Sequence, residues 1–219
     1  MYSQRIIQTA AVGKAPELRE LNLAQVKARQ AQGTRASLST PVTGVSGRLV
    51  VGLNFDTLGD LQAFRERNAS DNALQQYVAR ISALMASPVE TELWELFLPA
   101  QPGSAPAYVQ AVTWTAAVGK GPDLRAAVLE HFTKRQEEGF HCAVAEQVAS
   151  DAFRMRLNIL LGSLSDLETQ REHNRSDKAF LDFGRHIAPV LVATTVELSE
   201  VIVPFQPAAT PGLAGAATR

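Results

Sequence analysis

The chain has 219 residues, of which 46% are hydrophobic and 20% are charged. This composition supports a folded core and excludes an intrinsically disordered protein. Twenty-one Lys and Arg residues against 22 Asp and Glu residues give a net charge of −1, which argues against binding to nucleic acid or to an anionic membrane surface. The single cysteine, Cys142, excludes an intramolecular disulfide and favours a reducing compartment. The N-terminus lacks the pattern of a secretory signal and no apolar run reaches roughly 20 residues, so we expect a cytoplasmic protein.

An internal repeat organises the chain. Residues 9–33 and 115–139, at an offset of 106, are identical at 13 of 25 positions, and residues 58–73 and 164–179 are identical at 9 of 16. We therefore expect a tandem duplication. The predicted units are a first repeat over residues 1–99, a linker rich in Pro, Gly and Ser over 100–107, a second repeat over 108–204 and an irregular tail over 205–219.

Each repeat begins with a predicted strand, at residues 4–12 and 110–118. A helix follows, and we expect it to end at Gly33 and Gly139, as helices commonly end at a glycine.

Two strands with period-two alternation come next. Their apolar faces are predicted to pack on the helices, and they comprise Ala36, Leu38, Leu49, Val51, Leu53 and Phe55 with the residues 106 positions later. Thr57 and Ser163 then begin a second helix with an approximate capping box. That helix is predicted to break near residues 68–71 and 174–177, and each repeat closes with a strand, at 92–98 and 197–203.

The order strand, helix, strand, strand, helix, strand is that of a ferredoxin-like unit, which has an antiparallel sheet with both helices on one face. A unit of about 100 residues with a bare sheet face is marginally stable, so we expect the two sheets to cover each other. The predicted fold class is α+β, with two tandem ferredoxin-like βαββαβ units whose antiparallel sheets face each other as a single-chain α/β barrel.

This element order, with the strand Arg48-Leu49-Val50-Val51-Gly52-Leu53-Asn54-Phe55, resembles the dimeric α/β-barrel superfamily, which includes antibiotic-biosynthesis monooxygenase-like and NIPSNAP-like proteins. The resemblance covers residues 2–99 and 108–204. It implies a barrel between two units, with small organic molecules bound inside in several branches. In monooxygenase-like members, pocket Asn and Trp residues handle a bound aromatic substrate or haem, and Asn158, Trp94 and Trp114 resemble that set in composition. Core packing is the alternative for both Trp residues.

The polar faces of the middle strands supply the other candidate residues. Arg154, Arg156, Asn158 and His141 are predicted to project from the second repeat into the barrel, where Arg and Asn could bind an anionic or carbonyl group. Because buried guanidinium groups need partners, a network with the glutamates of the last strands is the alternative. Those glutamates are Glu92, Glu95, Glu197 and Glu200.

All four histidines lie in the second repeat, but only His141 occupies a predicted barrel-facing position. We therefore expect no metal site.

Three functions stay open at this point, and no catalytic residue is assigned. The first is binding of a small anionic or carbonyl-bearing organic molecule inside the barrel, with no cofactor. The second is a cofactor-independent monooxygenase-like enzyme acting on an aromatic substrate, and the third is a structural or assembly module with a filled barrel. As a partner we expect a small-molecule ligand, with no nucleic acid and no membrane, and a homodimer of the duplicated chain is left open.

Overall fold

The computed structural model describes residues 1–101, 103, 105–150 and 152–206. Within these ranges each half of the chain has a strand, a helix, two strands, two helices and a closing strand. The first half consists of β1 (Tyr2–Thr9), α1 (Ala15–Ala31), β2 (Arg35–Pro41), β3 (Arg48–Phe55), α2 (Leu58–Ala69), α3 (Asn72–Ser82) and β4 (Glu90–Leu98). The second half consists of β5 (Tyr108–Ala116), α4 (Gly121–Glu137), β6 (Cys142–Gln147), β7 (Arg154–Leu161), α5 (Leu164–Ser176), α6 (Lys178–Ile187), the short 3-10 helix η1 (Ala188–Val190) and β8 (Leu191–Val203).

The eight strands of the described residues close into one antiparallel barrel, in the order β1-β3-β2-β8-β5-β7-β6-β4. The strands of each half stay together, and the halves join where β2 pairs with β8 and β4 pairs with β6. Both joints contain a register shift, between Leu38 and Ser39 and between Leu96 and Leu98. Closure pairs every strand on both sides, so a described strand has no exposed edge.

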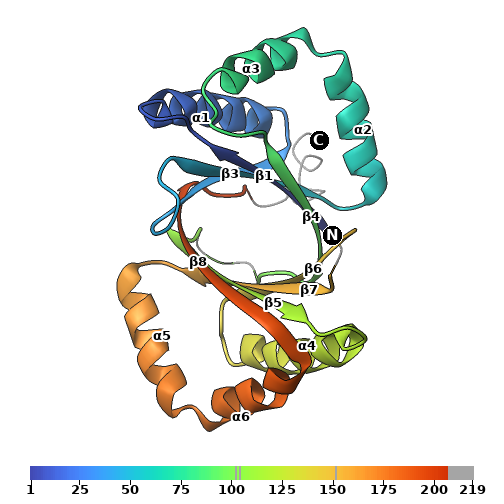
Figure 1. The fold of residues 1–219 in the computed structure, drawn as a ribbon, viewed down its shortest axis with the longest axis vertical. Coiled ribbons are helices and arrows are strands. Elements are labelled where there is room, and N and C mark those ends of the chain that lie inside the picture. Colours follow the sequence, from blue (N-terminus) through green and yellow to red (C-terminus); the bar gives the residue numbers. More distant parts are fainter. Residues whose placement is uncertain (102, 104, 151, 207–219) are drawn as a thin grey trace, which may run out of the picture.

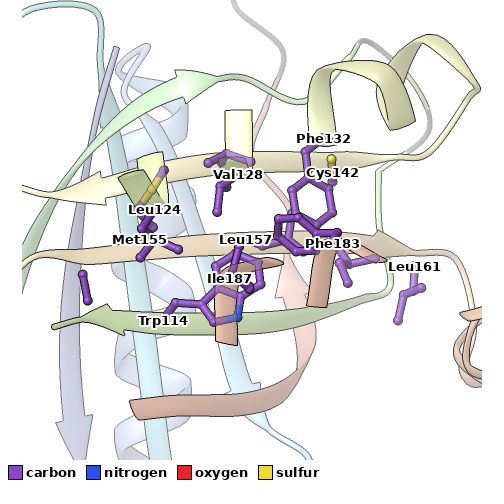
Figure 2. Packing of buried hydrophobic residues seen from close by; sticks show 13 residues of the cluster. Trp114, Leu124, Val128, Phe132, Cys142, Met155, Leu157, Leu161, Phe183 and Ile187 are labelled. Carbon is purple, nitrogen blue, oxygen red and sulfur yellow. The ribbon is translucent and has the colours of Figure 1, made fainter. Parts of the chain in front are cut away.

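The helices lie outside the barrel in two groups, α1 to α3 on one side and α4 to α6 on the opposite side (Figure 1). Each group packs on the outer sheet face of its own half and forms a separate hydrophobic core. In the first core Leu18 of α1 packs with Leu38 and Leu53. In the second, Phe132 and Phe183 pack with Met155 and neighbouring residues (Figure 2). The barrel interior is therefore a compartment distinct from both cores.

Local sequence signals account for the helix ends. Thr57 and Ser163 each form a capping box with the acidic residue three positions later, as predicted. Gly33 and Gly139 follow the ends of α1 and α4 with φ of +82° and +91°, a region that glycine enters without steric strain. The predicted break in the second helix is confirmed, since Asp71 caps α3 and Asp177 caps α6.

The strand boundaries differ from those predicted. β1 and β5 begin and end earlier, because pairing with β3 and β7 stops at Thr9 and Thr115, and Val12 and Val118 lie exposed in the turns that follow. β8 begins at Leu191, six residues before the predicted start, because it pairs with β5 along its length before it reaches β2. Of the predicted tail, residues 207–219 lie outside the described residues. Among the helices that the structure describes, none combines the length and apolar character needed to cross a membrane.

The second core predicts a specific stability effect. Replacing the fully buried Phe132 with Ala (Phe132→Ala) should lower the free energy of unfolding by about 3–5 kcal/mol, because the ring leaves a cavity between α4 and the sheet. Val118→Ala, at an exposed position, should change it by less than about 0.5 kcal/mol. Urea unfolding of both variants measures the difference, and an equal effect at the two positions would contradict this description of the core.

Candidate functional site

The barrel encloses a cavity of about 400 Å³, lined by residues from all eight strands. Small side chains create the space, namely Ser37 and Ser39 of β2 and Ala143 and Ala145 of β6. The period-two alternation of their strands turns these four residues inward, opposite the apolar faces that pack on the helices. Longer apolar side chains cover other parts of the wall, and they include Val50, Trp94, Leu96, Val109, Leu160 and Val201.

One part of the wall is shaped by the close approach of Phe205 to β3. A Cβ atom added to Gly52 would lie 2.8 Å from Cζ of Phe205 and 2.6 Å from Oγ of Ser37. Only glycine leaves room for this ring without a shift of the neighbours. Phe205, Pro204 and Gln206, which follow β8, therefore line the cavity together with Met1 at the start of the chain.

Two arginines and two glutamates form a charged cluster inside the barrel. Nη2 of Arg156 lies 3.1 Å from Oε2 of Glu197, and Nη2 of Arg5 lies 3.4 Å from the same oxygen. Arg5 also pairs through Nη1 with Oε2 of Glu92, at 2.6 Å. The cluster joins β1, β4, β7 and β8 and is neutral as a set.

Arg156 is the most enclosed member of this cluster, with 8% of its surface exposed. Its Nε donates to Oδ1 of Asn158 at 3.1 Å, and its Nη1 donates to Oγ1 of Thr113 at 3.4 Å. Burial, followed by the positive charge of Arg5, lowers the pKa of Arg156 to about 10. The guanidinium group therefore stays protonated at neutral pH.

Glu197 is held in its ionised form by the same neighbours. Burial alone would raise the pKa of its carboxyl group, but Arg5 and Arg156 outweigh that effect and bring the pKa below its usual value. The second oxygen, Oε1, is buried and has no hydrogen-bond partner among the described residues. Oδ1 of Asn54, which lines the cavity, is also buried without a partner there. The barrel thus holds polar atoms that a ligand or water could satisfy.

Three of the six predicted ligand-binding residues meet in this cavity: Arg156, Asn158 and Trp94. The indole Nε1 of Trp94 donates to Oε2 of Glu92 at 3.1 Å, and Cζ of Arg156 lies 5.9 Å from the centre of the Trp94 ring. The ring therefore belongs to the charged cluster on one side and to the cavity wall on the other.

The other three predicted residues lie elsewhere. Trp114 points out of the barrel and stacks on Phe132, with ring centres 6.1 Å apart, because Ala111 takes the inward position on β5. Arg154 lies exposed at the start of β7, where Nη1 donates to Gln147 at 3.4 Å. His141 precedes β6 and lines a separate surface pocket of about 510 Å³.

The predicted Arg–Glu network is present in part. Glu92 and Glu197 take part, but Glu95 faces the outside of the barrel and accepts a hydrogen bond from Tyr2 at 3.4 Å. Glu200 is exposed. The reason is the strand period of two, which places Glu92 and Glu95 on opposite faces.

Sequence reasoning missed Arg5. The signal was present in the alternation along β1, where Ser3 and Arg5 line the cavity while Gln8 bonds to α1. Which face of this first strand of the chain lines the barrel could not be decided from the sequence alone.

Within the part of the chain that the structure describes, no group of three or more His, Cys, Asp or Glu side chains could hold a metal ion. The lining of the barrel includes instead three arginines, Arg5, Arg35 and Arg156, with Asn158 and several hydroxyl groups that an organic ligand could contact. Such a site can bind and orient a hydrogen-bond acceptor against apolar walls.

No family model matches the chain, and no curated protein matches it in sequence. Solved structures share its architecture. A proposed monooxygenase from Fusobacterium nucleatum aligns with a TM-score of 0.74 at 10% identity, over 93% of this chain and 93% of its own. A proposed monooxygenase from Lactobacillus acidophilus gives 0.69 at 8% identity, over 91% and 93%. An anthrone oxidase-like protein gives 0.68 at 12% identity, over 97% and 96%. At these identities the likeness concerns the fold alone.

The charged cluster predicts an acid-dependent stability. Because the pKa of Glu197 is lowered in the folded state, its ionised form stabilises the fold above the unfolded pKa of about 4.5, and this contribution disappears as the pH falls through the folded pKa. Glu197→Gln should cost about 3 kcal/mol at pH 7, since it leaves Arg156 without a carboxylate. Between pH 5 and pH 3 the variant should also lose less of its free energy of unfolding than the wild type, because glutamine has no carboxyl group that becomes protonated.

Urea unfolding across that pH range measures both effects. Glu200→Gln, at an exposed position of the same strand, is the matched control and should behave as the wild type. Parallel pH profiles for wild type and Glu197→Gln would show that Glu197 is not held ionised by the cluster.

Proposed function

We propose that the barrel binds a small organic molecule through a carbonyl or anionic oxygen directed at Arg156 and Asn158. Two ferredoxin-like units, residues 1–99 and 108–204, which we infer arose by tandem duplication, would supply the two halves of the wall. The observation that carries the proposal is the cavity itself. It has about 400 Å³ of space, apolar walls and an enclosed guanidinium group in its lining.

The free hydrogen-bond donors and the paired charge of Arg156 favour a ligand with a neutral oxygen acceptor. A guanidinium group has five N–H donors, and the contacts of Arg156 use one each toward Asn158, Thr113 and Glu197. The remaining donors are available to a ligand oxygen. Because Glu197 already compensates the charge, a carbonyl or phenol fits the cluster without adding a net charge to it.

The size of the cavity favours ligand binding over a purely structural role as an assembly module. A barrel serving only as a structural unit is expected to be filled by its own side chains, as small barrels commonly are. Here serine and alanine on the inner faces of β2 and β6 keep the centre open. The space is within the range of small-molecule sites, which is roughly 300–1,000 Å³.

The proposal predicts that Trp94 reports binding. The chain has two Trp residues, so Trp114→Phe leaves Trp94 as the only indole, in the wall of the cavity. Menadione, a neutral two-ring quinone, should quench its fluorescence along a saturable curve. Adding Arg156→Met should weaken that binding by at least about tenfold, because a charge-assisted hydrogen bond to the carbonyl is lost.

Two controls locate the effect. Trp94→Phe keeps only Trp114, which lies in the outer core, and should show no saturable quenching. Naphthalene, which lacks an oxygen acceptor, should bind the Arg156→Met variant and its parent equally. If menadione affinity is the same with and without Arg156, the orientation proposed here is wrong.

A second candidate function is cofactor-independent oxygenation of a phenolic substrate. The observation that favours it is the convergence of Asn158 and Trp94 on one cavity, together with a fold that the two proposed monooxygenases and the anthrone oxidase-like protein share. In such a reaction a phenolate reduces O₂. One oxygen atom enters the ring to give a quinone and the other leaves as water.

Oxygen consumption tests this candidate. With anthrone as substrate, the protein should consume one O₂ for each quinone formed, and Asn158→Ala should lower the rate by at least about tenfold if its amide orients the substrate. Gln147→Ala, outside the cavity, is the control. A rate no higher than that of anthrone alone in buffer would exclude this substrate class and leave binding as the function.

A further inference from the structure

A second cavity, of about 240 Å³, lies outside the barrel in the first half of the chain. It is bounded by the outer face of β1 and β3 and by the helices α1 and α3. Apolar side chains form most of its lining, among them Val26, Leu74 and Ile81. Six polar side chains line it as well, and Arg29 is the charged one; the others are Gln8, Gln25, Tyr77, Ser82 and Thr91. We refer to it as the Arg29 pocket.

Arg29 is nearly enclosed, with 9% of its surface exposed. Among the described residues no carboxylate lies within 4.0 Å of its guanidinium group. Its Cζ lies 5.3 Å from the centre of the Phe64 ring, an arrangement that attracts the cation but does not neutralise it. Burial lowers the pKa of Arg29, yet a guanidinium group stays protonated in proteins. A buried charge of this kind favours an anionic partner.

In the second half of the chain, the arginine at the equivalent position is paired with carboxylates. The residue 106 positions after Arg29 is Arg135, and its Nη1 lies 3.0 Å from Oδ2 of Asp177 and 3.1 Å from Oε2 of Glu138. Gln32 stands where the second half has Glu138, and this removes one of the two carboxylates from the first half. Asp71 corresponds to Asp177 but does not come within ion-pair distance of Arg29. The two arginines therefore differ in their partners.

The two halves also differ in the side chains that surround the space beside this arginine. Gln8, Gln25 and Tyr77 correspond to Trp114, His131 and Phe183 of the second half. There the His131 ring stacks on Phe183 with centres 4.3 Å apart, and Trp114 meets Phe183 edge-on at 6.0 Å. Figure 2 shows Trp114 and Phe183 within the packed second core. Aromatic rings thus occupy the region that corresponds to the Arg29 pocket.

In the first half a hydrogen-bonded chain fixes the polar border of the pocket. Oη of Tyr77 donates to Oδ1 of Asn22 at 2.8 Å, and Nδ2 of Asn22 donates to Oε1 of Gln8 at 2.8 Å. Val128 replaces Asn22 in the second half. A fully buried Asn in such a chain holds Gln8 and Tyr77 in place beside the cavity.

We propose that the Arg29 pocket is a second ligand site, separate from the barrel, that binds a small carboxylate with an apolar body. The carboxylate would pair with Arg29, and the body would lie against Val26, Leu74 and Ile81. The volume suits a single-ring or short branched acid rather than the two-ring molecule expected in the barrel. Arg is well suited to this role because its planar donors match a carboxylate in two places.

Benzoate is the test probe, and benzamide is its neutral counterpart of the same shape. We expect benzoate to shift the NMR signals of Tyr77, Leu74 and Ile81 along a common saturable curve, with benzamide binding at least about tenfold more weakly. Arg29→Met should weaken benzoate binding by a similar factor. Arg135→Met, the matched change in the second half, should leave it unchanged.

Several results would overturn the proposal. One is equal affinity for benzoate and benzamide, since the anion would then not be recognised. Another is a set of shifts confined to the barrel residues and abolished by Arg156→Met, which would place benzoate at the other site. If Arg29→Met does not fold, the comparison of the two probes on the wild-type chain, with the shifts mapped to individual residues, decides the question without it.

Discussion

The ion pair between Arg156 and Glu197 is the interaction around which the barrel interior is arranged. A guanidinium group enclosed by a closed sheet must find its partners on the inner faces of that sheet, because water reaches it poorly. Glu197 supplies the charge from β8, Asn158 and Thr113 accept hydrogen bonds, and Arg5 with Glu92 extends the pairing to β1 and β4. The pair itself joins β7 and β8 of the second half, and the contact of Arg5 with Glu197 ties the first half to them. Arg156 also lines the cavity.

The two halves of the chain differ in polarity at several equivalent positions inside and outside the barrel. In the barrel, the second half contributes Arg156 and Asn158, where the first half has Val50 and Gly52. Outside the barrel the relation is reversed, since the first half has the buried chain of Gln8, Asn22 and Tyr77 where the second half is aromatic and apolar. At these equivalent positions the second half is the more polar inside the barrel and the first half is the more polar outside it, although Arg5 and Asn54 of the first half also line the barrel cavity. The two cavities therefore differ in the polar residues that line them.

Much of the fold could be predicted from the sequence, because the repeat allowed each position to be examined twice. Leu38 with Val144, and Leu53 with Ile159, are apolar in both halves of the chain, and all four are buried. The inward placement of Arg156 and Asn158 followed from the same alternation. A barrel was expected because each sheet would otherwise leave one face bare. The strand pairs that close it within the described residues, β2 with β8 and β4 with β6, join distant segments, and local periodicity does not encode such contacts.

The candidate site was harder to predict at the ends of strands and on the first and last strands of each half. The sequence did not distinguish Trp114 from Trp94 as a candidate binding residue. In the structure their side chains lie on opposite faces of the sheet, so that Trp114 packs in the outer core and Trp94 lines the barrel cavity. Arg154 has the inward parity of Arg156 and yet is exposed, because it begins its strand. Whether a residue has an odd or an even position in a strand determines the face of the sheet on which its side chain lies. How deeply that side chain is buried depends on how far the residue is from the end of the strand.

A crystal structure of the protein soaked with menadione would locate the ligand site. We expect density for the quinone inside the barrel, against Trp94, with one carbonyl oxygen within about 3.2 Å of a guanidinium nitrogen of Arg156. The Arg156–Glu197 pair should remain intact beside it. Menadione bound only outside the barrel, or an interior closed by rearranged side chains, would contradict the claim that this cavity is the ligand site.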